Sequence, residues 1–98
     1  MDGQRFVLVK FYAPWCGHCS NMAAAYRGLA EHFGERTDIV IAQMNADLYR
    51  EFTDHFGITG YPMLKLFRPG SLVPENFDCR RDLASMRDYA EKILQQKS

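Results

Sequence analysis

The sequence predicts a single α/β domain in which buried strands alternate with helices that have one apolar face. Residues 6–12 are almost continuously apolar, which is typical of a central strand covered on both faces. Residues 20–33 repeat apolar side chains at helical spacing. The 98 residues, 47% of them hydrophobic, suffice for one packed core but not for two. We therefore treat residues 1–98 as one domain.

The helix predicted at residues 20–33 presents one apolar stripe to the core. Gly34 follows it and is expected to take the left-handed conformation that commonly ends a helix. The stripe consists of Met22, Ala23, Tyr26, Leu29, Ala30 and Phe33.

A second strand is predicted at residues 39–44, where β-branched side chains are frequent. Asp47 is a candidate N-cap for a short helix that carries Phe52 and Phe56, and Gly57 is expected to end that helix. The order of elements to this point is strand, helix, strand, helix.

The last third of the chain predicts a hairpin and a final helix. Residues 63–67 form the third strand and residues 68–71 a turn, and Pro74 suits a sheet edge within a fourth strand at residues 72–77. Asp82 is expected to cap the final helix. Its buried stripe would be Leu83, Met86, Ala90, Ile93 and Leu94.

Charge and hydropathy exclude two classes of partner. Twelve basic residues balance twelve acidic ones, so the net field attracts neither nucleic acid nor an anionic membrane. No apolar run approaches the ~20 residues that span a bilayer, and residues 1–5 do not form a signal peptide. We therefore expect the partner to be selected by local chemistry.

The most informative motif is Trp15-Cys16-Gly17-His18-Cys19. Two cysteines separated by two residues can close a disulfide that opens and re-forms, which is thiol-disulfide exchange. The predicted strand ends just before the pair and the predicted helix begins just after it. Because a helix N-terminus favours a thiolate over a thiol, Cys16 is the predicted nucleophile.

Two alternatives to a redox pair are weaker. Half of a zinc site would need further ligands, and Cys79, His32 and His55 do not form a paired ligand motif. Two ordinary core cysteines fit poorly with the Gly-His dipeptide between them, which suits an exposed turn. We expect no metal, and the odd cysteine count leaves Cys79 as a free thiol.

The run Phe-Tyr-Ala-Pro-Trp-Cys-Gly-His-Cys at residues 11–19, with Gly60-Tyr61-Pro62 farther on, closely resembles a catalytic domain of the protein disulfide isomerase family. The likeness covers nearly the whole chain. It implies a thioredoxin fold, with a central mixed sheet flanked by helices, and a thiol-disulfide oxidoreductase or isomerase that requires no cofactor. It also implies cysteine-containing protein substrates and an oxidising secretory compartment such as the endoplasmic reticulum lumen.

The resemblance assigns roles within the motif. Cys16 would attack a substrate disulfide, and Cys19 would resolve the mixed disulfide that forms. Trp15, Gly17 and His18 would tune the pair, with the charge of His18 stabilising the Cys16 thiolate and the Trp15 ring shaping the surface beside it.

A substrate-binding role falls to Tyr61 and Pro62. A trans bond before Pro62 is the ordinary expectation, because only about 5 to 6% of such bonds are cis. The resemblance instead implies a cis bond that lies against the disulfide and leaves the backbone of Tyr61 free to pair with an extended substrate.

Lys10 departs from the family pattern, which has a buried glutamate on the strand before the motif. A charged lysine there would favour a thiolate at Cys19, a neutral one could accept the proton of Cys19, and a third alternative is that its side chain extends into water. Gln43 and Ser20 stand where the family commonly has lysines, so the local charges differ further.

Cys79 occupies a position where the family tends to have glycine, and a positive φ there would strain it. A packing role for this thiol is favoured over a regulatory or intermolecular disulfide. Arg81 matches an arginine that can assist the second cysteine of the motif.

The chain begins later than the family pattern, and we expect it to lack the first strand and helix of a complete thioredoxin fold. Residues 39–44 would then form an open sheet edge, and we expect a tendency to form a homodimer through it. Two alternatives to an independent isomerase remain. The domain could be a thioredoxin-fold binding or chaperone module, or the redox domain of a larger sulfhydryl oxidase that exchanges electrons with other domains or an upstream oxidase.

Overall fold

A mixed sheet of four strands forms the centre of the structure, a computed structural model that describes residues 4–96 apart from the side chain of His18. The strand order is β2-β1-β3-β4, with β1 parallel to β2 and antiparallel to β3. The elements in chain order are β1 (Phe6–Tyr12), α1 (Gly17–His32), β2 (Ile39–Asn45), α2 (Arg50–His55), β3 (Met63–Phe67), β4 (Glu75–Asn76) and α3 (Leu83–Gln95).

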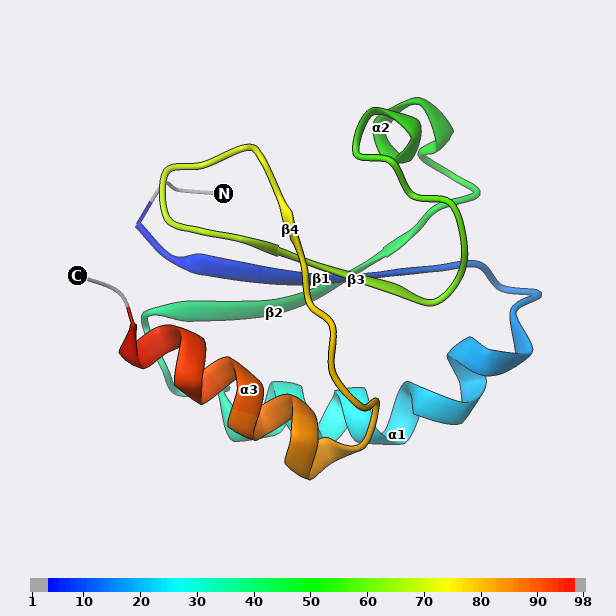
Figure 1. The fold of residues 1–98 in the computed structure, drawn as a ribbon. Coiled ribbons are helices and arrows are strands. Elements are labelled where there is room, and N and C mark those ends of the chain that lie inside the picture. Colours follow the sequence, from blue (N-terminus) through cyan, green and yellow to red (C-terminus); the bar gives the residue numbers. More distant parts are fainter. Residues whose placement is uncertain (1–3, 97–98) are drawn as a thin grey trace.

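Helices cover the two faces of the sheet unequally. Figure 1 shows α1 and α3 side by side along one face, whereas the short α2 lies on the other side. The larger core lies between the sheet and the helices α1 and α3, and it includes Phe6, Leu8, Leu29 and Met86. A smaller cluster on the opposite face contains Val9, Phe11, Ile58 and Phe67. Because successive residues of β1 point into opposite cores, the strand is apolar except at Lys10, as predicted.

The predicted strands and hairpin are confirmed, with one strand shorter than expected. β3 has the predicted bounds. In the turn that follows it, the Ser71 N–H donates to the Arg68 carbonyl at 3.0 Å and Gly70 has a φ of 77°. The fourth strand is restricted to β4, because Leu72 and Val73 are largely exposed and do not pair with β3.

The first helix begins earlier than predicted and ends without a left-handed glycine. α1 starts at Gly17 rather than near Ser20. Among the described residues only Gly57 and Gly70 have positive φ, so the prediction for Gly34 is wrong. The helix closes instead through the Phe33 N–H, which donates to the Leu29 carbonyl.

The other two helix caps had different outcomes. Asp82 caps α3 as predicted, since its carboxylate accepts the Ser85 N–H at 2.9 Å. Asp47 does not cap α2, whose N-cap position is Tyr49 without a side-chain bond. Gly57 follows α2 with a φ of 69°, which confirms the predicted end of that helix.

The buried stripes of α1 and α3 follow the predicted spacing. Tyr26 also joins α1 to two strands, because its hydroxyl donates to the Ala42 carbonyl at 2.5 Å and lies 3.2 Å from the Leu8 carbonyl. Leu83 is partly exposed, and its side chain lies over Gly28 of α1. The fully buried members of the stripes are Met22, Tyr26, Leu29, Phe33, Met86, Ala90, Ile93 and Leu94.

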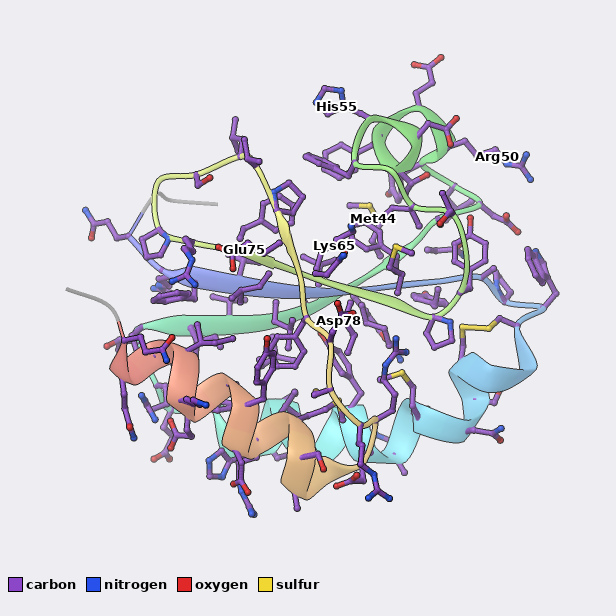
Figure 2. The ribbon with its side chains drawn as sticks, in the orientation of Figure 1. Met44, Arg50, His55, Lys65, Glu75 and Asp78 are labelled. Atoms are coloured by element: carbon purple, nitrogen blue, oxygen red, sulfur yellow. A yellow bond between two sulfur atoms is a disulfide. The ribbon has the colours of Figure 1, made fainter. Side chains whose placement is uncertain are left out.

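Within the described chain, β2 is an edge strand that pairs only with β1. This confirms the predicted open edge. Met44 of β2 and Lys65 of β3 lie on the face of the sheet toward α2 (Figure 2). None of the described helices is long and apolar enough to cross a membrane.

Candidate redox site

Cys16 and Cys19 form a disulfide at the N-terminal end of α1, visible as a yellow bond in Figure 2. Their Cα atoms are 5.3 Å apart. The three residues after β1 make a turn in which the Cys16 N–H donates to the Ala13 carbonyl at 3.0 Å. This turn places Cys16 at the N-cap of α1 and Cys19 in its first turn.

The two sulfur atoms differ in their position on the helix rather than in exposure. Cys16 and Cys19 are both nearly buried, at 8% and 6% exposed. The Sγ of Cys16 accepts the Cys19 N–H at 3.1 Å, so a side-chain sulfur caps the helix. No acidic residue lies in the first turn of α1. A thiolate at Cys16 would therefore be stabilised by an N–H donor and by the positive end of the helix dipole.

Trp15 is exposed but held in place from two sides. Its indole N–H donates to Asp47 Oδ2 at 2.7 Å, and its ring meets that of Tyr61 edge-on at 5.5 Å between centroids. Asp47 Oδ1 lies 3.5 Å from a guanidinium nitrogen of Arg50. The indole of Trp15, the residue before Cys16, is consequently fixed between Asp47 and Tyr61.

Tyr61-Pro62 has the cis peptide bond that the resemblance implied. Tyr61 packs against the cluster formed by Ala13, Cys16 and Cys19. The loop before β3 therefore lies directly beside the disulfide.

Arg81 reaches this same loop. Its Nη1 donates to the Pro62 carbonyl at 3.2 Å and lies 3.8 Å from the sulfur of Met22. Arg81 thus contacts the proline loop and α1, both of which adjoin the two cysteines.

Lys10 is buried beneath the redox pair, at 5% exposed. Its ammonium lies over the rings of Tyr26 and Tyr12, at 4.9 Å and 5.6 Å from their centroids. Little of this side chain is therefore exposed, which disfavours the alternative that it extends into water. Burial lowers the pKa of the Lys10 ammonium, so this amine loses its proton at a lower pH than an exposed lysine would.

Two small cavities meet at Lys10. One of about 260 Å³ is lined by Lys10, Ser20 and both cysteines, and the other, of about 330 Å³, continues past Tyr26 to Arg27. Gln43, which lies opposite Lys10 in the β1–β2 register, lines both. The small side chain of Ala23 borders both cavities and leaves this space open between α1 and the sheet.

Cys79 is half-buried and packs against the main core. Burial raises the pKa of its thiol. No described residue other than glycine has a positive φ, so the strain expected at Cys79 is wrong. Among the described residues, no group of three or more His, Cys, Asp or Glu side chains could hold a metal ion.

Comparison with known proteins agrees with this geometry. The family model described as Thioredoxin matches residues 1–92. The chain belongs to the thioredoxin family. The fold is the thioredoxin fold, a mixed sheet flanked by helices, and the disulfide has the spacing of two intervening residues.

The curated relatives of this thioredoxin domain are protein disulfide-isomerases. It is 43% identical over 83 residues to a probable protein disulfide-isomerase A6 of Medicago sativa and 40% identical over 83 residues to protein disulfide-isomerase tigA of Aspergillus niger. These matches cover 85% and 84% of the chain, and 23% of each relative. The chain therefore spans about a quarter of the length of these relatives.

Solved structures give the same family. The first thioredoxin domain of mouse protein disulfide-isomerase A4 superposes with a TM-score of 0.82 at 27% identity, over 97% of this chain and 67% of that one. Zinc-bound human ERp44 superposes with a TM-score of 0.79 at 28% identity, over 99% of this chain and 28% of that one. The likeness to catalytic domains of the protein disulfide isomerase family is thus confirmed.

Asp47 is the site residue that the sequence did not identify. It was assigned to a helix cap, because aspartate before a short helix commonly has that role. Its actual partner, Trp15, lies 32 residues earlier, and nothing in the local sequence connects the two.

We predict that Asp47→Ala frees the Trp15 indole. The indole N–H then loses its acceptor, and its hydrogen exchange should accelerate about fivefold, which corresponds to one net hydrogen bond of about 1 kcal/mol. Exchange of this proton can be followed by NMR without ambiguity, because Trp15 is the only tryptophan. Asp47→Asn keeps an acceptor and should retain most of the protection. Asp54→Ala removes an exposed carboxylate of α2 as a control, and equal exchange rates in Asp47→Ala and Asp54→Ala would contradict the contact.

Proposed function

We propose that this domain is a thiol-disulfide oxidoreductase and isomerase that acts on cysteine-containing proteins through Cys16 and Cys19. The observation that carries the proposal is the bond from the Cys19 N–H to Cys16 Sγ at the start of α1. This N–H donor would stabilise a thiolate at Cys16. The similarity to named protein disulfide-isomerases supports the same activity.

In the oxidised form, a substrate thiolate attacks Cys16 Sγ. The Cys16–Cys19 bond breaks, a mixed disulfide forms, and Cys19 leaves as a thiolate that takes up a proton. A second substrate thiolate then attacks the substrate sulfur of the mixed disulfide and releases Cys16 as a thiolate. The substrate is oxidised by two electrons and the domain is reduced to a dithiol. The reverse sequence reduces a substrate disulfide, and isomerisation starts from the dithiol.

The surrounding residues have supporting roles in this proposal. Trp15 and Tyr61 flank the disulfide and, with Pro62, form the surface over which an extended substrate would lie. Gly17 at the start of α1 leaves space beside the pair, since a side chain there would meet nothing within 4 Å. His18 lies between the cysteines in sequence, where a positive charge would stabilise the Cys16 thiolate.

An oxidising secretory compartment, such as the endoplasmic reticulum lumen, fits this activity. The similarity to protein disulfide-isomerases and to ERp44 supports it. An upstream oxidase or another domain would return the reduced pair to the disulfide. Immunolocalisation of the native protein to the cytosol would contradict this placement.

The decisive test is a trap for the mixed disulfide. We predict that Cys19→Ser accumulates mixed disulfides between Cys16 and substrate proteins, because the resolving thiol is absent. The adducts would appear on non-reducing gels and disappear on reduction, and mass spectrometry would locate them at Cys16. Cys16→Ser is the matched control and should trap far less. A Cys19→Ser protein that traps nothing would refute the catalytic role and favour a binding module.

We further propose that Lys10 assists ionisation of Cys19 across the cavity that they share. A charged Lys10 would stabilise the Cys19 thiolate, and a neutral Lys10 would accept the Cys19 proton. Replacing this lysine with glutamate removes both effects and adds a repelling charge. Its burial and lowered pKa support either role.

The predicted result is that Lys10→Glu shifts alkylation of Cys19 to higher pH by about one unit or more. The profile is measured on the reduced protein, with mass spectrometry of the Cys19-containing peptide. Lys65→Glu makes the same charge change on a neighbouring strand, where Lys65 bonds Asn76 on the surface. It should leave the profile unchanged, whereas coinciding profiles for wild type and Lys10→Glu would eliminate a catalytic role for Lys10.

Self-association through β2 is a separate proposal. Phe6 and Tyr12 of β1 pair with the backbone of Asp38 and Ala46, which flank β2. Since backbone direction alternates along a strand, Ile39, Ile41 and Gln43 turn their N–H and C=O groups away from β1. This uncharged edge can accept a second copy in antiparallel pairing.

We predict concentration-dependent dimerisation in sedimentation experiments. Gln43→Pro removes an outward N–H from each copy while leaving the bonds to β1 intact, and it should weaken dimerisation about tenfold. A strictly monomeric wild type over a wide concentration range would exclude pairing through this edge.

A further inference from the structure

A cavity of about 400 Å³ opens beside the cis proline loop. Three parts of the chain form its walls: α1 just after the cysteines, the loop before β3, and the segment before α3. Of the described residues that form the lining, Arg81 is the only charged one and none is a carboxylate. The lining residues are Asn21, Met22, Tyr61, Pro62 and Arg81.

Arg81 is held at the wall of this cavity with most of its donors unused. A guanidinium has five N–H donors. Arg81 uses those of Nη1 for the Pro62 carbonyl at 3.2 Å and the Met22 sulfur at 3.8 Å, which leaves the donors of Nε and Nη2. In the part of the chain that the structure describes, no carboxylate lies within ion-pair distance of Arg81. Other arginines do have such partners, namely Arg36, Arg50, Arg68, Arg80 and Arg87.

The cavity lies within reach of a substrate bound at the disulfide. Tyr61 belongs both to its lining and to the residues packed against Cys16 and Cys19. An extended peptide advances about 3.3 to 3.6 Å per residue, so the two residues on either side of the reacting cysteine lie within about 7 Å of it along the peptide. The same loop therefore borders the site of exchange and the cavity.

We propose that this cavity is a substrate subsite that selects an aspartate or glutamate close to the reactive cysteine. The inference rests on the proposed exchange activity and specifies its substrate class. A carboxylate would receive charge-assisted hydrogen bonds from the free donors of Arg81. A lysine would face a like charge, and an apolar side chain would leave Arg81 without a partner. The methylenes of a glutamate would lie against Met22 and Tyr61.

The test uses the oxidised domain and reduced peptides that each contain two cysteines. One peptide thiolate attacks Cys16 Sγ and displaces Cys19, and the second peptide thiolate then forms the peptide disulfide and releases Cys16. The peptide loses two electrons and the domain gains them. The peptides are identical except for Glu, Gln or Lys at one position, placed in turn at each of the two positions on either side of the first cysteine.

Each oxidation rate is divided by the rate of the same peptide with a small organic disulfide, which removes the effect of the substituent on the peptide thiol itself. At fixed low ionic strength we expect kcat/KM for the best-placed Glu peptide to exceed that for its Gln counterpart about three- to fivefold, the range of one partly exposed ion pair. The Lys peptide should be slowest. Arg81→Gln should reduce the Glu to Gln ratio to about one, and Arg81→Lys should retain part of it.

Arg80→Gln is the matched control, because the Arg80 side chain is 89% exposed and lies near Asp82 instead of lining the cavity. It should keep the ratio of the wild type. Equal rates for Glu and Gln peptides at all positions, with every peptide oxidised, would overturn the subsite and leave the exchange activity standing. A ratio that persists in Arg81→Gln would overturn the assignment to Arg81. Failure of the wild type to oxidise any peptide would overturn the exchange activity, and the subsite with it.

Discussion

Burial of β1 on both faces is the constraint on which the other elements depend. The strand pairs with β2 on one side and β3 on the other, and its side chains enter both cores. Pairing on both edges and packing on both faces fix the position of this strand. The residues that follow its last residue, Tyr12, therefore start from a fixed point. The turn after Tyr12 is short and hydrogen-bonded, so it also fixes where α1 begins.

The redox pair makes use of this junction. Cys16 closes the turn through its backbone, caps α1 through its sulfur, and shares a disulfide with Cys19 one turn along. The same sulfur atom that forms the disulfide also caps the helix, because it replaces the side-chain oxygen of an ordinary N-cap residue. This also explains why the helix begins at Gly17, before the first apolar residue of its stripe.

Two cations and one carboxylate lie near the redox pair. The buried cation Lys10 lies below it, Arg81 lies beside the proline loop, and Asp47 holds Trp15 on the far side. The Asp47 carboxylate already contacts the Trp15 indole and Arg50. The described surroundings of the disulfide consequently offer unpaired donors to an incoming substrate, which is the basis of the acidic subsite proposed above.

The sequence by itself determined the elements and the reacting residues, because both depend on local patterns. The apolar run of β1, the stripes of α1 and α3, the Asp82 cap and the two-residue spacing of the cysteines each need only a short stretch of chain. Tertiary structure decided what depends on residues distant in sequence: the burial of Lys10 against two tyrosine rings, the bond from Trp15 to Asp47 and the cavity at Arg81. These contacts join side chains across elements whose relative positions are set by packing, and no local periodicity encodes them.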